Sequence, residues 1–99
     1  MNMQQMIIQA QQIQRKLQKA QDELKLKEFT VSKGGAVTVV VKGDKTIKSV
    51  SIDKDAFDAE NKEMVEEMIA MAVNEAVEQI EKESAQINEQ ITGRSGGLF

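Results

Sequence analysis

Residues 31–52, VSKGGAVTVVVKGDKTIKSVSI, constrain the fold most, because they read as three short β-strands that cannot be stable alone. Valines recur at every second position of residues 37–41, which is the period of a strand with two different faces. Glycine-containing pairs at 34–35 and 43–44 stand where hairpin turns would join the strands. The chain has three Phe and no Trp or Tyr, so helices must supply most of the cover for this sheet.

Residues 3–24 predict a long helix with one narrow apolar stripe. No Gly or Pro interrupts this segment, and glutamines fill many of the remaining positions. The apolar positions are spaced alternately by three and four residues, which makes a heptad seam: Met3, Met6, Ala10, Ile13, Leu17, Ala20 and Leu24. So narrow a stripe favours another helix, rather than a flat sheet, as its neighbour.

A second long helix is predicted after Asp58, which is a suitable N-cap. Between residues 64 and 77, apolar side chains cover a wide arc of this helix, wide enough to contact the sheet and one further surface. From Ile80 the arc narrows to a seam with the spacing of the first helix, at Ile80, Ser84, Ile87 and Ile91. We therefore expect the far ends of the two helices to pair antiparallel as a projecting arm. Methionines of both helices are expected to fill the core, at positions 3, 6, 64, 68 and 71.

The expected fold class is α+β: a long helix, a three-stranded antiparallel β-meander and a long helix. One domain covers residues 1–92, and a flexible Gly-rich C-terminal tail covers 93–99. The sheet face toward the helices is expected to hold Phe29, Val31, Val37, Val39, Val41, Val50 and Ile52. The opposite face is small and hydroxylated, with Ile47 assigned to it past the turn. That face and the surplus arc at 64–77 exceed what one chain can cover, so we expect a homodimer.

The residue types exclude most kinds of catalytic chemistry. Cys and His are absent, which removes a thiol nucleophile, the usual general base and the commonest metal ligands. Residues 53–63, DKDAFDAENKE, resemble a calcium loop but have Asp58 where that loop requires glycine. We expect no enzyme activity, metal, cofactor or small-molecule substrate. No signal peptide or apolar run of membrane-spanning length is present either, which favours a soluble cytoplasmic protein.

Charge is divided unevenly along the chain. The net charge is −3, yet residues 1–54 carry ten Lys/Arg against five acids, and residues 55–99 carry three against eleven. The two halves could neutralise each other through surface ion pairs, or the first half could present a local basic surface.

Arg15, Lys16 and Lys19 project from one side of the first helix, with Gln12 nearby. They could contact phosphates, or they could be a solvated flank paired with acids of the second helix at 78, 81 or 83. The residues alone leave both interpretations open. The absence of aromatic side chains nearby argues against stacking on single strands, so duplex DNA is the better candidate ligand.

The order of these segments resembles the YbaB/EbfC family of bacterial nucleoid-associated proteins. The resemblance covers residues 3–92 and depends on four stretches in this order: MQQMIIQAQQIQRKLQKAQDEL, KGGAVTVVVKG, IKSVSID and AMAVNEAVEQI. The tail GRSGGLF is similar too. The resemblance implies a nucleoid-associated homodimer shaped like tweezers, whose helical arms hold duplex DNA with little sequence specificity and affect gene expression and nucleoid organisation. It favours phosphate contact by Arg15, Lys16 and Lys19, with Gln12 and the tail residue Arg94 as further DNA-binding candidates.

A second class of function fits the same outline. A helix pair that projects from a small β-body is also typical of prefoldin-like chaperone subunits, which hold unfolded chains between apolar arm tips. Met3, Met6, Ile7 and Ile8 would lie at such a tip, and methionine adapts to varied partners. The basic side chains of the first helix have no purpose in that function, and a DNA-binding titration separates the two classes.

Overall fold

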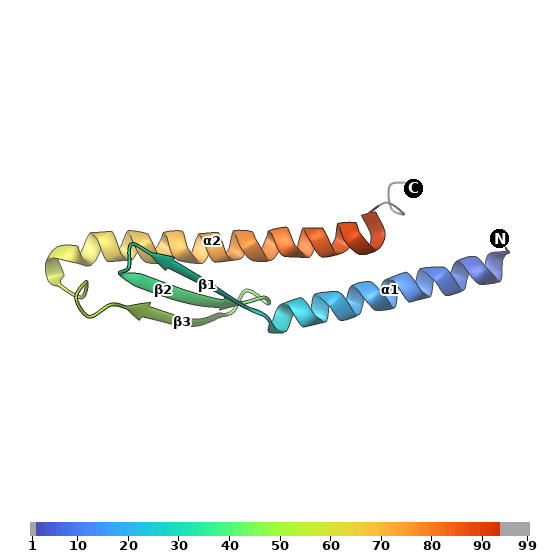
Figure 1. The fold of residues 1–99 in the computed structure, drawn as a ribbon, viewed down its shortest axis with the longest axis horizontal. Helices are drawn as coiled ribbons and strands as arrows, with labels where there is room; N and C mark the ends of the chain where they lie inside the picture. The colour runs from blue at the N-terminus through green and yellow to red at the C-terminus, as the bar shows by residue number, and fades with distance from the viewer. Residues whose placement is uncertain (1, 94–99) are drawn as a thin grey trace.

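The structure, a computed structural model, describes residues 2–93 and has the predicted α+β fold (Figure 1). In chain order its elements are helix α1 (Met3–Leu26), strands β1 (Glu28–Lys33), β2 (Val37–Lys42) and β3 (Ile47–Ile52), a 3₁₀ turn η1 (Ala59–Asn61), helix α2 (Lys62–Asn88) and a π-helical turn η2 (Glu89–Gly93). The molecule measures 69 × 21 × 14 Å, because α1 and the second half of α2 both run beyond the sheet. Of the expected tail 93–99, Gly93 belongs to η2, and residues 94–99 lie outside the described residues, so the flexible tail remains a prediction.

The two helices begin in different ways. The Asn2 side chain accepts a hydrogen bond of 2.8 Å from the Gln5 N–H, which caps the first turn of α1. Asp58 is a cap as predicted, but of the short turn η1, where its carboxylate accepts from the Glu60 N–H at 2.9 Å. Helix α2 follows from Asn61, which makes no side-chain cap hydrogen bond.

The three strands form an antiparallel meander in the order β1-β2-β3. Lys33 pairs with Val37 and Glu28 with Lys42, so the β1–β2 ladder is regular from end to end. The turn between them contains Gly34 and Gly35, both at positive φ (58° and 66°), where a side chain would be strained. The predicted glycine turn is therefore confirmed here for its expected reason.

The β2–β3 hairpin differs from the expectation in two respects. Its left-handed residue is Lys45 (φ 70°), whereas Gly43 has no positive φ and is buried instead. A β-bulge between Val40 and Val41 also shifts the register, so that Val41 faces Ile47. Directly opposite residues share a sheet face, so Ile47 lies on the helix side, and its predicted place on the hydroxylated face is wrong.

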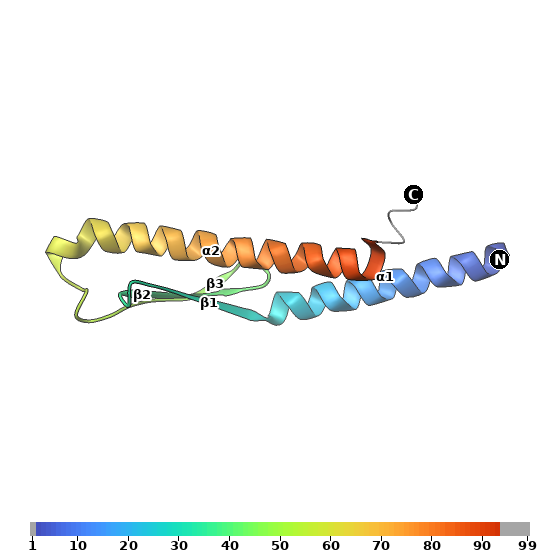
Figure 2. The same cartoon turned by 45° about the horizontal axis from the view of Figure 1, so that its top comes forward.

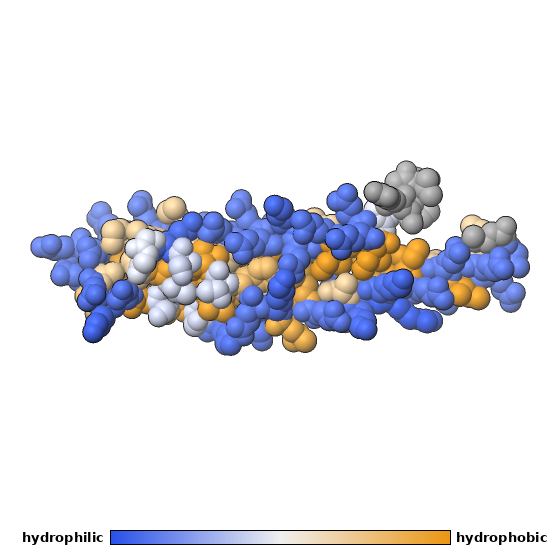
Figure 3. Space-filling model, in the orientation of Figure 1, coloured by the Kyte–Doolittle hydropathy of each residue, from blue (hydrophilic) through white to orange (hydrophobic). Residues whose placement is uncertain are grey.

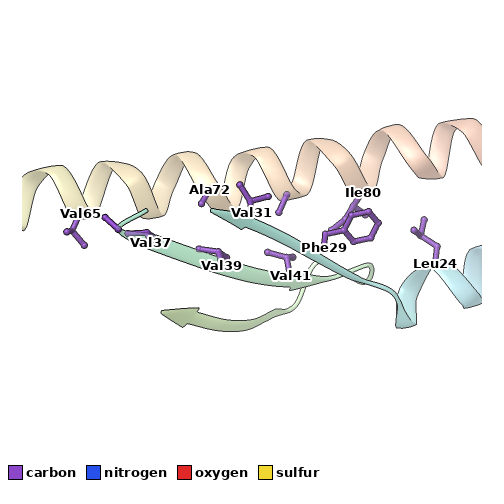
Figure 4. Packing of buried hydrophobic residues seen from close by; sticks show 11 residues of the cluster. Leu24, Phe29, Val31, Val37, Val39, Val41, Val65, Ala72 and Ile80 are labelled. Atoms are coloured by element: carbon purple, nitrogen blue, oxygen red, sulfur yellow. The ribbon is translucent and has the colours of Figure 1, made fainter. Parts of the chain in front are cut away.

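Helix α2 covers β1 and β2 along one face of the sheet, and the core lies between these layers (Figure 4). Val39 and Val41 are fully buried there, against Ala72 and Ala76. Small alanines on the helix let its backbone approach the sheet closely, so valines suffice to fill the space. The predicted inward residues of β1 and β2 are confirmed as buried: Phe29, Val31, Val37, Val39 and Val41.

Strand β3 lies largely outside this cover. Its residues are exposed except for Ile52, which is half-buried, and Val50 is 44 % exposed although it is paired with the buried Val39. Val50 thus faces the helix layer as predicted, but α2 does not reach far enough to bury it. An apolar edge of the sheet remains uncovered in the single chain.

The predicted antiparallel arm is present, over part of the predicted length. Helix α1 runs back along the end of α2 and η2 (Figures 1 and 2). From Leu24 to Ile13 the seam residues of α1 are buried or half-buried. Beyond Ile13 the described part of α2 and η2 has ended, and Met3, Met6 and Ala10 are exposed. The seam of α1 thus continues in sequence beyond the described part of its partner.

Most of the methionines are not core residues, contrary to the expectation. Met3, Met6, Met64 and Met71 are 76 %, 57 %, 41 % and 56 % exposed. Only Met68 of those five packs against the core, and its methyl group lies close to Gly34. Valine and alanine fill the thin layer between α2 and the sheet, so the longer methionines lie on the flanks of α2 and on the end of α1.

Candidate nucleic-acid interface

The basic side chains of α1 lie together on the arm. Arg15, Lys16 and Lys19, called here the basic ridge, are exposed, as is Gln12 one turn earlier. The seam residues Ile13 and Leu17 face α2, so successive rotations of about 100° per residue turn Arg15 and Lys19 away from it. The structure therefore brings the four predicted residues of α1 onto one accessible surface, while Arg94 lies outside the described residues.

Ion pairs elsewhere in residues 2–93 occupy other cations. Three of the six link the two halves of the chain: Lys27 to Glu83 at 2.8 Å, Lys33 to Glu75 at 3.1 Å and Lys45 to Glu81 at 3.3 Å. The remaining three are Lys25–Asp22, Lys48–Glu28 and Lys62–Glu66. The interpretation that the halves pair with each other is thus correct for the body of the protein.

The basic ridge takes no part in these pairs within the described residues. Of the three carboxylates suggested as its partners, Glu81 pairs with Lys45 and Glu83 with Lys27, and Glu78 makes no ion pair with the ridge. Through residue 21, α1 carries the three cations of the ridge and no acid, whereas residues 78–93 carry four carboxylates and one lysine. The arm has a basic helix and an acidic helix, and only the former would attract an anionic ligand.

A polar cluster fastens the two helices of the arm, and sequence reasoning did not identify it as important. The Gln21 Nε2 donates to the Ser84 carbonyl (3.3 Å) and to Asn88 Oδ1 (3.1 Å), while the Ser84 hydroxyl donates to Gln21 Oε1 (3.2 Å). One signal was available: Ser84 is the polar residue in an otherwise isoleucine seam. Such a polar contact within an apolar seam fixes which residues lie opposite each other.

The base of the arm is attached through Gly43. Its N–H donates to the Lys27 carbonyl at 2.8 Å, and a Cβ at this position would lie 1.7 Å from the Leu24 carbonyl oxygen. The β2–β3 turn can touch the last turn of α1 only because position 43 has no side chain. The direction of α1, and with it the basic ridge, depends on this contact.

An apolar strip lies along the open edge of the sheet. It consists of Ile47, Val50 and Ile52 of β3 with the facing flank of α2, Ile69, Val73 and Val77, all exposed or half-buried. At one end it deepens into a groove of about 470 Å³ between Ile52, Ala56, Phe57 and Ile69, where Phe57 is 79 % exposed. Figure 3 shows weakly polar and apolar surface, in white and orange, over the sheet below the mostly hydrophilic outer side of α2.

Residues 2–93 contain no cluster of three or more Asp and Glu side chains able to hold a metal ion. Among the helices described, none combines the length and apolarity needed to cross a membrane.

Comparison with known proteins agrees with the resemblance noted from the sequence. The sequence model of the YbaB/EbfC DNA-binding family matches residues 1–95. A nucleoid-associated protein of Clostridium novyi is 40 % identical over 94 residues, which are 94 % of this chain and 82 % of that protein. A protein of the same name from Acetivibrio thermocellus is 39 % identical over 98 % of this chain and 87 % of that relative. Another from Lactococcus lactis is 42 % identical over 87 % of this chain and 88 % of that relative. The chain therefore belongs to the YbaB/EbfC DNA-binding family.

Proposed function

We propose that this protein is a nucleoid-associated DNA-binding protein that acts as a homodimer in the bacterial cytoplasm, holding duplex DNA between two helical arms. Family membership and the names of its relatives support the general function. We assign DNA binding to the basic ridge because its three cations have no acidic partner within residues 2–93. Neither the family nor the relatives' names favour a prefoldin-like chaperone.

Contact with DNA is expected on the α1 side of the arm. The polyanion is attracted by the ridge and repelled by the carboxylates of residues 78–93, so charge alone orients the arm. Arg15, Lys16 and Lys19 contact phosphates, and Gln12 donates a hydrogen bond to the backbone or a base edge. Arg94 adds a further phosphate contact. Phosphate contacts carry no sequence information, so binding has little sequence specificity.

The apolar strip is the proposed dimer contact. In a single chain its six aliphatic side chains from β3 and α2 are only half-buried or exposed, and β3 also presents an unpaired strand edge. A second copy covers both when the two strips meet about a two-fold axis, because each chain offers the same surface. The hydroxylated face of the sheet, with Ser49 and Ser51 exposed, was the other expected contact and is the alternative.

A salt titration with labelled nonspecific duplex tests DNA binding. With three ridge cations in each protomer, the ridge neutralises up to six phosphates and contributes at most about −5 to the slope of log K against log salt. Changing Arg15, Lys16 and Lys19 together to Gln keeps helix propensity and should flatten the slope and weaken binding to every duplex alike. A matched control changes Lys48, Lys54 and Lys62 to Gln, which alters net charge equally but lies on the body.

The two variants give opposite expectations. The body variant should retain most of the salt slope, since only contacting cations release counterions. Equal loss in both variants would mean that overall charge, not the ridge, governs binding. A wild-type chain that fails to bind duplex but prevents an unfolded protein from aggregating would favour the chaperone function.

Sedimentation tests the dimer and its contact separately. Wild-type protein at micromolar concentration should have the mass of two chains. Val50→Lys places a charge in the strip and should shift the mass toward one chain, whereas Ser49→Lys, on the other face of the same strand, should not. Dissociation by Ser49→Lys alone would assign the contact to the hydroxylated face instead.

A further inference from the structure

The N-terminal end of α1 is an exposed apolar surface that DNA binding does not use. Met3, Met6, Ile7 and Ile8, called here the arm tip, are 76 %, 57 %, 51 % and 51 % exposed. In both views of the fold, α1 continues past the end of α2 (Figures 1 and 2). The tip is thus the outermost part of the arm.

The arm tip continues an existing helix–helix contact. Met3, Met6 and Ala10 have the spacing of Ile13 and Leu17, which pack against the end of α2 and η2. A seam of this width fits another helix, and the described partner ends at Gly93. Within the described residues no helix lies beside this part of the seam, so its spacing suits a helix from outside them.

The chemistry of the tip selects the kind of helix. No side chain from Asn2 to Gln14 is charged, and the first charged side chain is that of Arg15. DNA would make no ionic contact with this surface. Two copies of the tip, in contrast, bring together matching apolar seams without any like-charge repulsion.

We propose that the arm tips of the two protomers of one dimer pair with each other through the seam Met3, Met6 and Ala10. This inference rests on the proposed homodimer but not on contact between the ridge and DNA. Residues 3–10 make only about two helical turns, too few for a stable separate coiled coil, so pairing depends on the high local concentration that a shared dimer body provides. Paired tips close the space between the arms, so that a bound duplex is enclosed.

Disulfide trapping tests this pairing, because the natural chain has no cysteine. Met6→Cys places one thiol on the seam, and Gln5→Cys, the matched control, places it on the neighbouring residue off the seam. Under mild oxidation without DNA, chains with Cys at position 6 should link at least about fivefold faster, because tip pairing raises their effective concentration. Adding Met3→Gln to Met6→Cys removes an apolar seam residue and should slow linkage toward the control rate.

Sedimentation of the same samples separates failure of this inference from failure of the proposed function. A dimer whose Met6→Cys and Gln5→Cys forms link equally fast, or not at all, overturns tip pairing and leaves the dimer intact. A mass of one chain overturns the dimer and the tip pairing together.

Enclosure of DNA has its own readout. The Met6→Cys protein, oxidised in the presence of a circular plasmid, should stay on that plasmid at high salt and be released when the plasmid is cut. Release from circular and linear plasmid alike would show that the linked arms do not surround the duplex and would overturn the enclosure.

Discussion

Gly43→Ala should loosen the base of the arm while leaving the sheet folded. The new Cβ would stand 1.7 Å from the Leu24 carbonyl oxygen and 2.6 Å from its carbonyl carbon, both backbone atoms. Neither distance is tolerable, so the last turn of α1 and the β2–β3 turn must move apart by more than an ångström. No rotamer change can relieve such a clash.

The cost follows from the contacts that this movement breaks. The hydrogen bond from the Gly43 N–H to the Lys27 carbonyl contributes about 1 kcal/mol. Leu24, which is 5 % exposed, loses part of its burial, worth about 1–2 kcal/mol. We expect the free energy of unfolding to fall by about 2–3 kcal/mol in total.

Urea unfolding at one fixed protein concentration measures this loss, since dimerisation makes stability concentration-dependent. Gly35→Ala is the matched control: its φ of 66° strains alanine, at about 1 kcal/mol, but nothing lies within 4 Å of the new Cβ. Hydrogen exchange should quicken over residues 17–26 in Gly43→Ala and not in Gly35→Ala. Equal stability loss in both variants, with residues 17–26 unchanged, would refute the close contact.

Three further substitutions probe the arm, the core and the β2–β3 turn. Leu17→Asp puts a charge into the half-buried seam and should speed hydrogen exchange over residues 6–20 while α2 and the sheet stay protected. Val39→Ala empties a fully buried site and should cost about 2–3 kcal/mol in urea unfolding, against under about 1 kcal/mol for Val40→Ala on the other face. Hydrogen bonds from the Thr46 side chain and N–H lower the pKa of Asp44 below its ordinary value of 3.8. The ionised carboxylate therefore stabilises the fold above that pH, and this stabilisation is lost as the pH falls through the lowered pKa. The stabilities of Asp44→Asn and wild type, measured from pH 2 to pH 7, should therefore converge at the acid end.

The fold was predictable because its main patterns are regular and local. The period of two in 37–41 specifies one buried face, which the structure buries; of the heptad seam predicted over 3–24, the part from Ile13 to Leu24 is buried or half-buried. No sequence pattern indicates where the β-bulge lies or how much of the sheet α2 covers. A one-residue shift at the bulge transferred Ile47 to the other face, and the narrowness of α2 left Val50 exposed.

The site was predictable in part, for a related reason. Helical spacing alone grouped Arg15, Lys16 and Lys19, but whether acids neutralise them depends on three-dimensional neighbours. The sequence offered Glu78, Glu81 and Glu83 as partners; the structure pairs Glu81 with Lys45 and Glu83 with Lys27, and Glu78 with no ridge cation. Gly43 carried a turn signal, yet its function in seating α1 depends on a contact nineteen positions away in the chain, with Leu24.

The distribution of ion pairs explains how an acidic chain can carry a surface for DNA. Its net charge of −3 would repel a polyanion at long range, and salt screens that repulsion beyond about 10 Å. At contact only the nearest charges matter, and on the exposed side of α1 those are the three ridge cations. Because Lys27 and Lys45 are held by Glu83 and Glu81, carboxylates of the arm are directed toward the body rather than toward the ridge. Replacing Lys27 or Lys45 should therefore weaken DNA binding more than the loss of one positive charge far from the DNA would. Each replacement leaves a carboxylate of the arm without its lysine partner, and that carboxylate repels the DNA.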